Sequence, residues 1–495
     1  MKFIRLILLL CLCLSGCKVG PNYVPPRERF CDEWTDAPGE TDVVPSNEDP
    51  PEAWWLQLGD PILVNLIHQA VQFNNDIRAA EANVLQAKAV RVMEAAALYP
   101  HLFFDGNGSR TSFSKNGPLF EIPTGTSTGT PTPAVVVPTI PQVQNLFNAT
   151  LDVSWELDLF GKNIRRVEAA QDNFEAAIDQ KNGVLISVIA EVAINYVELR
   201  SAQRQAEIIE SNIGLLDQTT GISRQRFKAG LINALDNERI EAELSTNIAN
   251  LPPVKAQIYR NLFALSVLIG SSPEALECDL LPVLPLPNAP KEIALGLRSD
   301  ILRRRPDVRE AERQLAAATA NIGVAIASFY PTITLTGDLG FQSLRLQNLL
   351  TPKSKTWSYM GDVYIPIFQG GKLVANLQIS EAQAAEQYYN YRKTVLNALA
   401  EAERWWVAYT QDSAAALQLQ DTVRRTAKVS ELSNGRYRNG LINMTDWLDT
   451  ERTNLNAQQN LLNSETQSLL DLIALYKALG GGWKVELEKN EGICY

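Results

Sequence analysis

The 495-residue chain contains one long sequence pattern twice. Residues 226–233 (RFKAGLIN) recur as residues 436–443 (RYRNGLIN), an offset of 210. Upstream the offset is 231, which places Tyr99-Pro100 on Tyr330-Pro331. A tandem duplication of about 200 residues accounts for most of the chain, so the fold must be built from two equivalent units.

The two offsets differ by 21 residues, so one copy carries an insertion between Pro100 and Gly161. A run rich in Thr, Pro and Gly, residues 117–141, is typical of an inserted loop. We therefore divide the chain into six parts: residues 1–16, 17–60, 61–270 (copy one), 271–300 (a Pro-rich linker), 301–480 (copy two) and 481–495.

The first residues have the pattern of a secretory signal peptide. Lys2 and Arg5 precede an apolar run that closes with Leu14-Ser-Gly-Cys17. This ending is a lipobox, in which Cys17 becomes the lipidated first residue of the mature protein. An ordinary signal peptide with a chance cysteine is the alternative. Because Lys18 and not Asp follows the cysteine, nothing retains the lipoprotein at the inner membrane.

Composition excludes several classes of function. The net charge of -11 argues against nucleic acid as a partner. Past the signal peptide no stretch reaches about 18 uninterrupted apolar residues, so any membrane crossing must be made by strands. Only two histidines, His68 and His101, are present, so a histidine metal site is not expected. After acylation of Cys17 three thiols remain, those of Cys31, Cys278 and Cys494. They allow at most one disulfide.

Four segments alternate apolar and polar residues as strands do, two in each copy. They are residues 101–113, 147–159, 332–341 and 357–367. Each predicted strand has an apolar face and an opposite face of Asn, Thr, Asp and Glu. Such a strand is suited to a barrel wall with lipid on one side and a water-filled lumen on the other. A soluble sheet with one wet face is the alternative. Aromatic residues near the segment ends favour the membrane: Trp155, Phe160, Trp357 and Tyr359. Four strands cannot close a barrel, so we expect the chain to pool strands with copies of itself.

The remainder of each copy is rich in Ala, Gln and Glu and is predicted to be helical. The stretch 163–227 would be about 97 Å long as one helix, too long for a compact domain. Narrow, Ala-rich stripes suit helices packed closely around a wide tube. A plain coiled coil is the alternative, but it leaves the matching strand pairs unexplained. Helices are expected at residues 62–98, 165–227, 235–269, 307–329, 373–437 and 447–479, with only the third interrupted, by Pro252-Pro253.

Two tight helix hairpins are predicted where the repeated motif occurs. Gly230 and Gly440 each follow a basic last turn and each precede an Asn. Glycine reaches the left-handed conformation that ends a helix, and Asn233 or Asn443 can cap the next helix. These features are also consistent with turns that have no function beyond structure.

The duplication, the lipobox and the paired Gly-Leu-Ile-Asn turns together resemble the TolC-like outer-membrane efflux proteins. The segment after the lipobox, Cys17-Lys-Val-Gly-Pro-Asn-Tyr23, is similar to the start of the lipoprotein branch, the OprM/CusC-like partners of resistance-nodulation-division pumps. The resemblance implies an α+β membrane protein that forms a homotrimer. Twelve strands would make one outer-membrane β-barrel, twelve helices a periplasmic α-helical barrel, and residues 271–300 an equatorial belt with the N-terminal segment and C-terminal tail.

A periplasmic gate follows from the same resemblance. Asp446 and Asp449 are three apart on one helix face, so three-fold symmetry would gather six carboxylates, and the matching aspartates of the family form the constriction. At offset 210 Asp236 matches Asp446, but Arg239 matches Asp449. Two solvated acids in the first turn of a helix, favoured by the helix dipole, are the alternative.

The resemblance also implies a latch that holds this gate closed. Residues matching Tyr437 and Asp236 keep the constriction closed in the family, so a Tyr437 to Asp236 hydrogen bond is the expected latch. The family's latch arginine aligns with Ile442 here, so Arg436 or Arg438 would have to replace it. The two turns, Gly230-Leu231 and Gly440-Leu441, are expected to contact a periplasmic adaptor.

The function predicted from the sequence is that of a passive exit duct in a tripartite efflux system, which exports small molecules such as drugs. The chain has no nucleophile–base pair, phosphate loop or metal cluster, so we expect neither an enzyme nor a cofactor beyond the lipid (palmitate) on Cys17. Its partners would be an adaptor and an inner-membrane pump, and its location the outer membrane with an extension into the periplasm. A duct for type I protein secretion and a structural trimeric adhesin are the alternatives.

Overall fold

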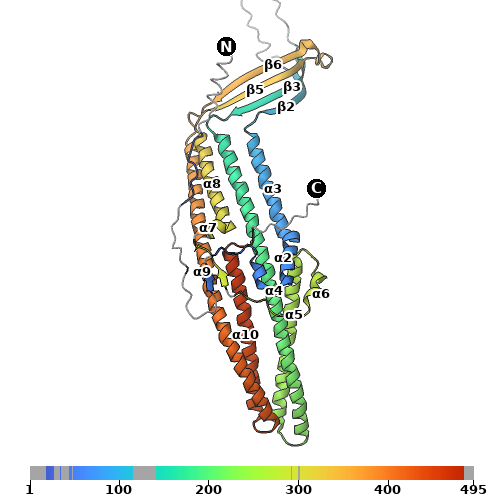
Figure 1. The fold of residues 1–495 in the computed structure, drawn as a ribbon. Helices are drawn as coiled ribbons and strands as arrows, with labels where there is room; N and C mark the ends of the chain where they lie inside the picture. Colours follow the sequence, from blue (N-terminus) through green and yellow to red (C-terminus); the bar gives the residue numbers. More distant parts are fainter. Residues whose placement is uncertain are drawn as a thin grey trace, which may run out of the picture. The chain divides into compact units, whose positions relative to one another are not determined.

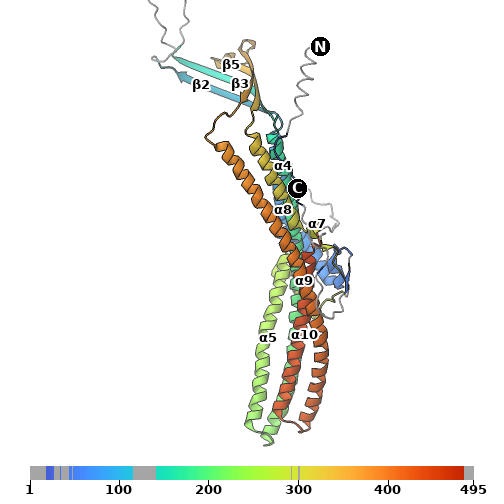
Figure 2. The same ribbon diagram turned by 90° about the vertical axis from the view of Figure 1, so that its left-hand side faces the viewer.

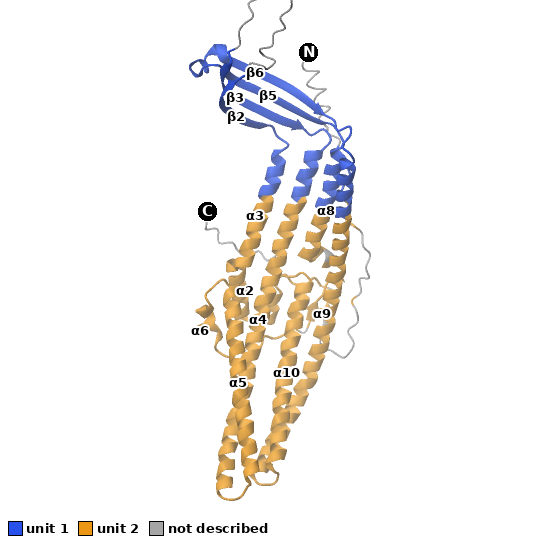
Figure 3. Cartoon of the chain, turned by 180° about the vertical axis from the view of Figure 1, so that it is seen from behind, with its two compact units in different colours: residues 1–23, 89–171, 317–384 blue, residues 24–88, 172–316, 385–495 orange. Residues whose placement is uncertain are grey.

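The computed structural model describes residues 18–26, 34, 44–46, 48–114, 141–290, 292–298 and 301–483. The predicted lipidation site Cys17, nearly all of the insertion and the tail from residue 484 lie outside this description, as do Cys31 and Cys494. The chain forms two compact units, coloured in Figure 3. Unit 1 comprises residues 1–23, 89–171 and 317–384, and unit 2 comprises residues 24–88, 172–316 and 385–495.

Unit 1 contains a four-stranded antiparallel sheet with the order β2-β3-β5-β6 (Figure 1). Its strands are β2 His101–Ser112, β3 Val143–Leu157, β5 Thr332–Ser343 and β6 Lys355–Tyr364. Two short 3-10 helices, η4 Leu346–Asn348 and η5 Pro352–Ser354, connect β5 to β6. All four strand predictions are confirmed within a few residues, including those over 101–113 and 357–367, where the period-two alternation is weaker.

The register gives the two faces of this sheet opposite characters. A row of large apolar side chains crosses all four strands: Phe104, Leu151, Leu339 and Trp357. One residue along, Asp152 pairs with Asp338 on the other face. Successive side chains of a strand point to opposite faces, so a single register separates the two sets. The apolar row is largely exposed in the single chain.

The long helices come in pairs of equal length. α4 Lys162–Lys228 and α9 Lys372–Arg438 each have 67 residues, and α5 Ala234–Leu268 and α10 Met444–Ala478 each have 35. α3 Asn75–Ala96 and α8 Pro306–Ala327 each have 22. Matching helices begin 210 or 231 residues apart, the two offsets of the sequence repeat. Equal helices at these offsets are what a duplication produces.

The helix predicted over residues 62–98 is in fact two helices, which corrects that prediction. α2 Pro61–Phe73 ends at Asn74, whose ψ of 133° is extended, and α3 begins directly after it. The Asn74 side chain accepts hydrogen bonds from the main-chain N–H groups of Asp76 (2.8 Å) and Ile77 (3.1 Å). Its amide nitrogen donates to the Leu268 carbonyl oxygen at 2.8 Å. One asparagine therefore caps the second helix and fixes it to the end of α5.

The predicted interruption at Pro252-Pro253 is wrong, since α5 continues through both prolines. Each proline removes one main-chain donor and is unfavourable inside a helix by about 3 kcal/mol. Just over one turn before the prolines, α5 is bonded to α4: the Asn212 side chain of α4 donates to Asn247 of α5 at 2.9 Å.

In the described residues between α5 and α8, unit 2 has four short elements: η2 Pro273–Leu276, α6 Glu277–Leu280 and β4 Glu292–Ala294 in the linker, and α7 Ile301–Arg304 at the start of copy two. β1 Val44–Ser46 pairs with β4 in parallel, and η1 Trp54–Leu58 follows it in sequence. Trp54 stacks on Tyr476 of α10 with ring centroids 5.4 Å apart. The N-terminal segment therefore joins the linker, as the resemblance implied.

Among the helices that the structure describes, α4 alone contains a stretch long and apolar enough to cross a membrane by composition. That 18-residue stretch is 56% buried inside the protein. Such burial is what a core helix of a folded protein shows, so composition alone does not make α4 a membrane span.

Candidate functional site

Both helix hairpins of unit 2 end in the same kind of turn (Figures 1 and 2). In each turn the leucine N–H bonds to the carbonyl oxygen five residues earlier, at 2.9 Å. The preceding glycine is left-handed, with φ of +74° at Gly230 and +71° at Gly440. This is the Schellman ending, in which glycine is favoured because it has no Cβ. Leu231 and Leu441 follow, 74% and 71% exposed.

The predicted caps of the next helices are confirmed. Asn233 accepts a hydrogen bond from the main-chain N–H of Asp236, and Asn443 accepts one from that of Asp446, both at 2.8 Å. The two hairpins are therefore closed by equivalent local bonds, and each turn is specified by its own short motif.

An apolar cluster joins the two hairpins just behind the turns. This tip cluster consists of residues from α4, α5, α9 and α10: Leu216, Ile240, Tyr437, Met444, Trp447 and Leu448. Tyr437 stacks on Trp447 with ring centroids 5.3 Å apart and an interplanar angle of 15°. The packing of these side chains holds the ends of the four helices together.

The hydrogen bond predicted from Tyr437 to Asp236 is absent, which corrects the latch as first inferred. The Tyr437 hydroxyl is buried and has no hydrogen-bond partner. Stacking on Trp447 places the ring in the tip cluster, and the Arg226 guanidinium lies over it, 5.4 Å from the centroid. Burial raises the pKa of Tyr437, and Arg226 opposes that rise only in part. The ring of Tyr437 therefore belongs to the apolar tip cluster, with the Arg226 guanidinium beside it.

The two hairpins are connected by arginine side chains other than those of Arg436 and Arg438, which were predicted to do so. Arg226 donates to the main-chain oxygen of Arg438 at 2.9 Å. The Arg438 side chain instead bonds Asn434 on its own helix at 3.1 Å, and Arg436 is exposed. Neither predicted side chain, Arg436 or Arg438, is therefore brought to Tyr437 in the single chain.

Two further links between α5 and α10 were missed from the sequence. Arg239 donates to the Thr445 hydroxyl at 2.8 Å, and Arg452 Nε donates to Glu243 Oε2 at 3.0 Å. The hydrogen bond to Glu243 and its charge raise the pKa of Arg452. One signal could have found these residues: at offset 210 Arg452 matches Ala242, so its charge occurs in one copy only.

The two aspartates predicted to line the pore are both exposed near the start of α10. Within the described part of the chain, neither Asp446 nor Asp449 has a side-chain hydrogen bond or an ion pair. Asp449 lies one turn before Arg452 and adds to the rise of that residue's pKa. The single chain thus presents two free carboxylates three residues apart on one helix.

The residues next to the predicted lipid site are fixed within unit 1. The buried Arg165 side chain donates to the main-chain oxygens of Val19 (3.0 Å) and Gly20 (2.9 Å) and to the Asn22 side chain (3.0 Å). Lys18 forms an ion pair with Glu168 at 2.6 Å. Burial would raise the pKa of Glu168, but hydrogen bonds from Lys18 and Arg165 outweigh it and lower that pKa.

In the described ranges, no three His, Cys, Asp or Glu side chains come close enough together to hold a metal ion. Cys278 is exposed and has a free thiol. Fold and site together define a repeat protein that combines an amphipathic sheet with paired helical hairpins, the architecture of a channel component.

Comparison with known proteins gives the same result. A family model described as outer membrane efflux protein matches residues 66–271 and 297–481. The solvent efflux pump outer membrane protein SrpC of Pseudomonas putida is 30% identical, over 98% of this chain and 99% of its own length. The probable efflux pump outer membrane protein TtgC of Pseudomonas putida is 29% identical, over 95% of this chain and 93% of its own length. The solved structure of the outer-membrane channel OprN has a TM-score of 0.84 at 29% identity and covers 94% of this chain and 100% of its own.

The chain belongs to the outer membrane efflux protein family. It is therefore an outer-membrane efflux channel and not an enzyme. The family predicted from the sequence motifs is confirmed.

Proposed function

We propose that three copies of this chain form the passive exit duct of a tripartite efflux pump. The strands would span the outer membrane and the hairpin tips would lie in the periplasm. A periplasmic adaptor would connect the tips to an inner-membrane pump, which supplies the energy. The exported compounds would be small molecules such as drugs or solvents, in keeping with the similarity to a solvent efflux protein.

The observation that carries this proposal is the open, amphipathic sheet of unit 1. Its edge strands β2 and β6 have 12 and 10 residues and no partner on their outer sides in the single chain. Backbone groups inside a membrane must be paired, and four strands are too few to close on themselves. If β6 of each copy pairs with β2 of the next, three copies close a twelve-strand barrel, with the apolar row facing lipid.

The gate of this duct would lie at the hairpin tips. Three-fold symmetry would bring Asp446 and Asp449 of three copies near the axis, where their negative charge favours cations. The tip cluster and the links between hairpins would favour the closed state. Asp236 is half-buried and Arg436 exposed, so both are available for contacts with a neighbouring copy.

The two turns would be the adaptor contacts. Gly230, Leu231, Gly440 and Leu441 have equivalent geometry, so a trimer would present six similar tips. Exposed leucines at six tips are suited to apolar contact with helical hairpins of a partner.

A lipid on Cys17 would anchor the chain beside its barrel. The lipobox motivates this, and the fixing of residues 18–22 by Arg165 would keep the anchor close to unit 1. Replacement Cys17→Ser should abolish palmitate labelling while trimers still form. Undiminished label in the variant would refute lipidation at this residue.

The duct itself is tested with purified protein. We expect a mass of three chains by native mass spectrometry and discrete conductance steps in planar bilayers. The double variant Leu231→Asp and Leu441→Asp should lose adaptor cross-linking and drug resistance together while remaining trimeric. The exposed Leu56→Asp serves as a matched control that should retain both. A monomeric, non-conducting protein would overturn the proposal.

A further inference from the structure

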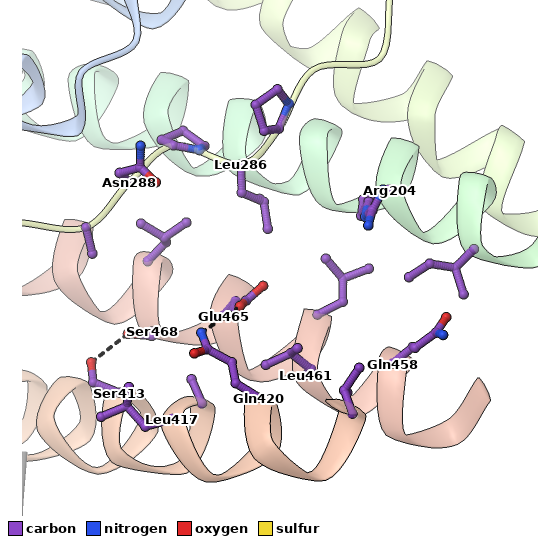
Figure 4. Close-up of a pocket in the computed structure, with 18 of the residues that line it drawn as sticks. Arg204, Leu286, Asn288, Ser413, Leu417, Gln420, Gln458, Leu461, Glu465 and Ser468 are labelled. Atoms are coloured by element: carbon purple, nitrogen blue, oxygen red, sulfur yellow. Dashed lines mark hydrogen bonds between the residues drawn. The ribbon is translucent and has the colours of Figure 1, made fainter. Parts of the chain in front are cut away.

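Unit 2 contains a cavity of about 1200 Å³ between α4, α9, α10 and part of the linker (Figure 4). We call this part of the linker, residues 283–290, the strap. The cavity lies away from the hairpin tips, and neither the gate nor the adaptor contacts make use of it.

The strap is attached to the helices at both ends. Before it, Arg200 donates to the Pro282 carbonyl oxygen at 2.9 Å, and Gln203 donates to that of Leu280 at 2.7 Å. At its far end the Tyr409 hydroxyl donates to the Pro290 carbonyl oxygen at 3.4 Å. All three donor side chains are buried. The ends of the strap are therefore held in place by α4 and α9.

Four prolines restrict the conformation of the strap and its attachment points. Pro285 and Pro287 lie within it, and Pro282 and Pro290 occupy the two attachment points. Proline fixes φ and has no N–H, so the strap can neither coil into a helix nor complete a strand ladder. An extended strap that is held at both ends therefore forms one wall of the cavity.

The walls of the cavity are mainly apolar. Leu286 points from the strap toward α9 and α10, which contribute Leu417 and Leu461 (Figure 4). Further apolar lining comes from Ile208, Leu284 and Leu462. A volume and a lining of this kind are typical of sites for drug-sized organic molecules.

One carboxylate in this lining has no compensating charge. Glu465 is partly buried and accepts a hydrogen bond from the neutral Gln420 side chain at 3.3 Å. The one lining arginine, Arg204, is already paired with Glu207 on its own helix. Among the residues that the structure describes, no cation forms an ion pair with Glu465. The cavity therefore carries one net negative charge within apolar walls.

The other copy of the repeat shows the compensated version of this pair. At offset 210 Gln420 matches Glu210 and Glu465 matches Lys255. In copy one these residues form an ion pair at 2.8 Å. In copy two an amide occupies the first position and the acid is left without a cation, and this is the copy that lines the cavity.

We propose that the cavity under the strap binds an apolar organic cation, with Glu465 as its counter-charge and the leucines around its apolar body. A carboxylate half-removed from water is costly unless it is paired, and an organic cation supplies the partner. A divalent metal ion is a poorer occupant, because it requires several oxygen ligands and the second carboxylate of this lining, Glu207, is already paired with Arg204. The site is distinct from the gate and does not rest on the proposed duct.

Two probes of the same shape and opposite charge test this proposal: tetraphenylphosphonium and tetraphenylborate. Equilibrium dialysis against the purified full-length protein in neutral detergent should show saturable binding of the phosphonium, one per chain. Tetraphenylborate should bind only as it does to detergent alone. Glu465→Gln and Gln420→Lys should each weaken phosphonium binding about tenfold or more, since the first removes the charge and the second pairs it.

Matched variants complete the test. Glu210→Gln, the equivalent position in copy one, should leave binding unchanged, and Leu461→Trp should abolish it by filling the cavity. Thermal melting identifies any variant that has lost its fold. The variants that remain folded then decide whether the cavity binds the phosphonium. Equal binding of both probes, no saturable phosphonium binding, or full binding by Glu465→Gln would overturn the proposal.

Discussion

The ring of Tyr437 stacks on Trp447, with centroids 5.3 Å apart, across the turn that joins α9 to α10. Leu216 and Ile240, from the other hairpin, pack in the same cluster. The tips of the two hairpins are therefore joined by apolar packing around this stack. The tyrosine hydroxyl, buried and without a partner, contributes nothing to that contact in the single chain.

Trp447→Ala should loosen the tips, whereas Tyr437→Phe should not. The alanine change removes a fully buried side chain and should cost about 3–5 kcal/mol locally. The phenylalanine change removes only an unpaired hydroxyl and should be neutral to slightly stabilising. Hydrogen exchange at residues 437–448 and resting conductance in bilayers measure both effects. A rise in conductance for Tyr437→Phe would show that the hydroxyl acquires a partner, such as Asp236, in the assembled trimer.

Arg452→Ala should increase opening of the tips with little effect on global stability. The Glu243–Arg452 pair joins α5 to α10, but the arginine is largely exposed, so its contribution is about 1 kcal/mol or less. We expect several-fold faster hydrogen exchange at both turns and an unchanged melting temperature. Arg424→Ala is the control, because Arg424 bonds Asp421 on its own helix. Equal exchange rates in the two variants would mean that the α5–α10 link does not hold the tips together.

Much of the fold could be predicted because its signals are local and occur twice. The alternation in residues 147–159 and the glycine before Leu231 each specify their element without help from distant parts. Where prediction failed, tertiary contacts decided the outcome. Asn74 lies at a helix break and bonds the Leu268 carbonyl, and α5 continues through Pro252-Pro253 although both prolines disfavour a helix.

The candidate site was only partly predictable for the same reason. The turns and the asparagine caps depend on neighbouring residues, so the motif identifies them. The links from Arg239 and Arg452 depend on which faces of α5 and α10 meet, and helical periodicity in two weakly amphipathic helices does not specify that. The absence of the Tyr437 to Asp236 bond likewise follows from the stacking partner of the ring, Trp447.

Asp471 should make the stability of unit 2 depend on pH. It is 1% exposed on α10, and burial followed by a hydrogen bond with Asp412 raises its pKa to about 6. Among the described residues the Asp471 carboxylate accepts one hydrogen bond, from the Gln467 side chain at 2.8 Å, and its second oxygen is buried without a partner, so burial penalises the charged form. The raised pKa means that folding favours the protonated form. The contribution of Asp471 to the free energy of unfolding is therefore fully present below about pH 4. It is lost as pH rises through about 6, and the loss amounts to at most about 3 kcal/mol.

The variant Asp471→Asn mimics the protonated acid and should remove this loss. Its melting temperature relative to the natural protein should rise between about pH 4 and pH 6 and then level off, as followed by circular dichroism. The exposed Asp279→Asn is a control that should give a constant difference. A pH-independent difference for Asp471→Asn would show that the acid has the same pKa in the folded and unfolded chain.

Asp446 and Asp449 should determine the cation preference of the closed pore. Both carboxylates are exposed and have no side-chain partner among the described residues, and the equivalent of Asp449 in copy one is Arg239, so the doubled acid belongs to one hairpin. Six such groups around a three-fold axis repel one another and attract cations. The double variant Asp446→Ala and Asp449→Ala should therefore lose selectivity for potassium over chloride and lose block by multivalent cations.

Single-channel recording of purified trimers measures both properties. Asp449→Glu, which keeps the charge, should retain the block, and Asp279→Ala, an acid outside the hairpins, should change neither property. Resting conductance should rise in the double alanine variant if bound cations help to close the pore. Unchanged selectivity together with unchanged block would assign both aspartates to the start of α10 alone, where the helix dipole favours acids whatever the channel does.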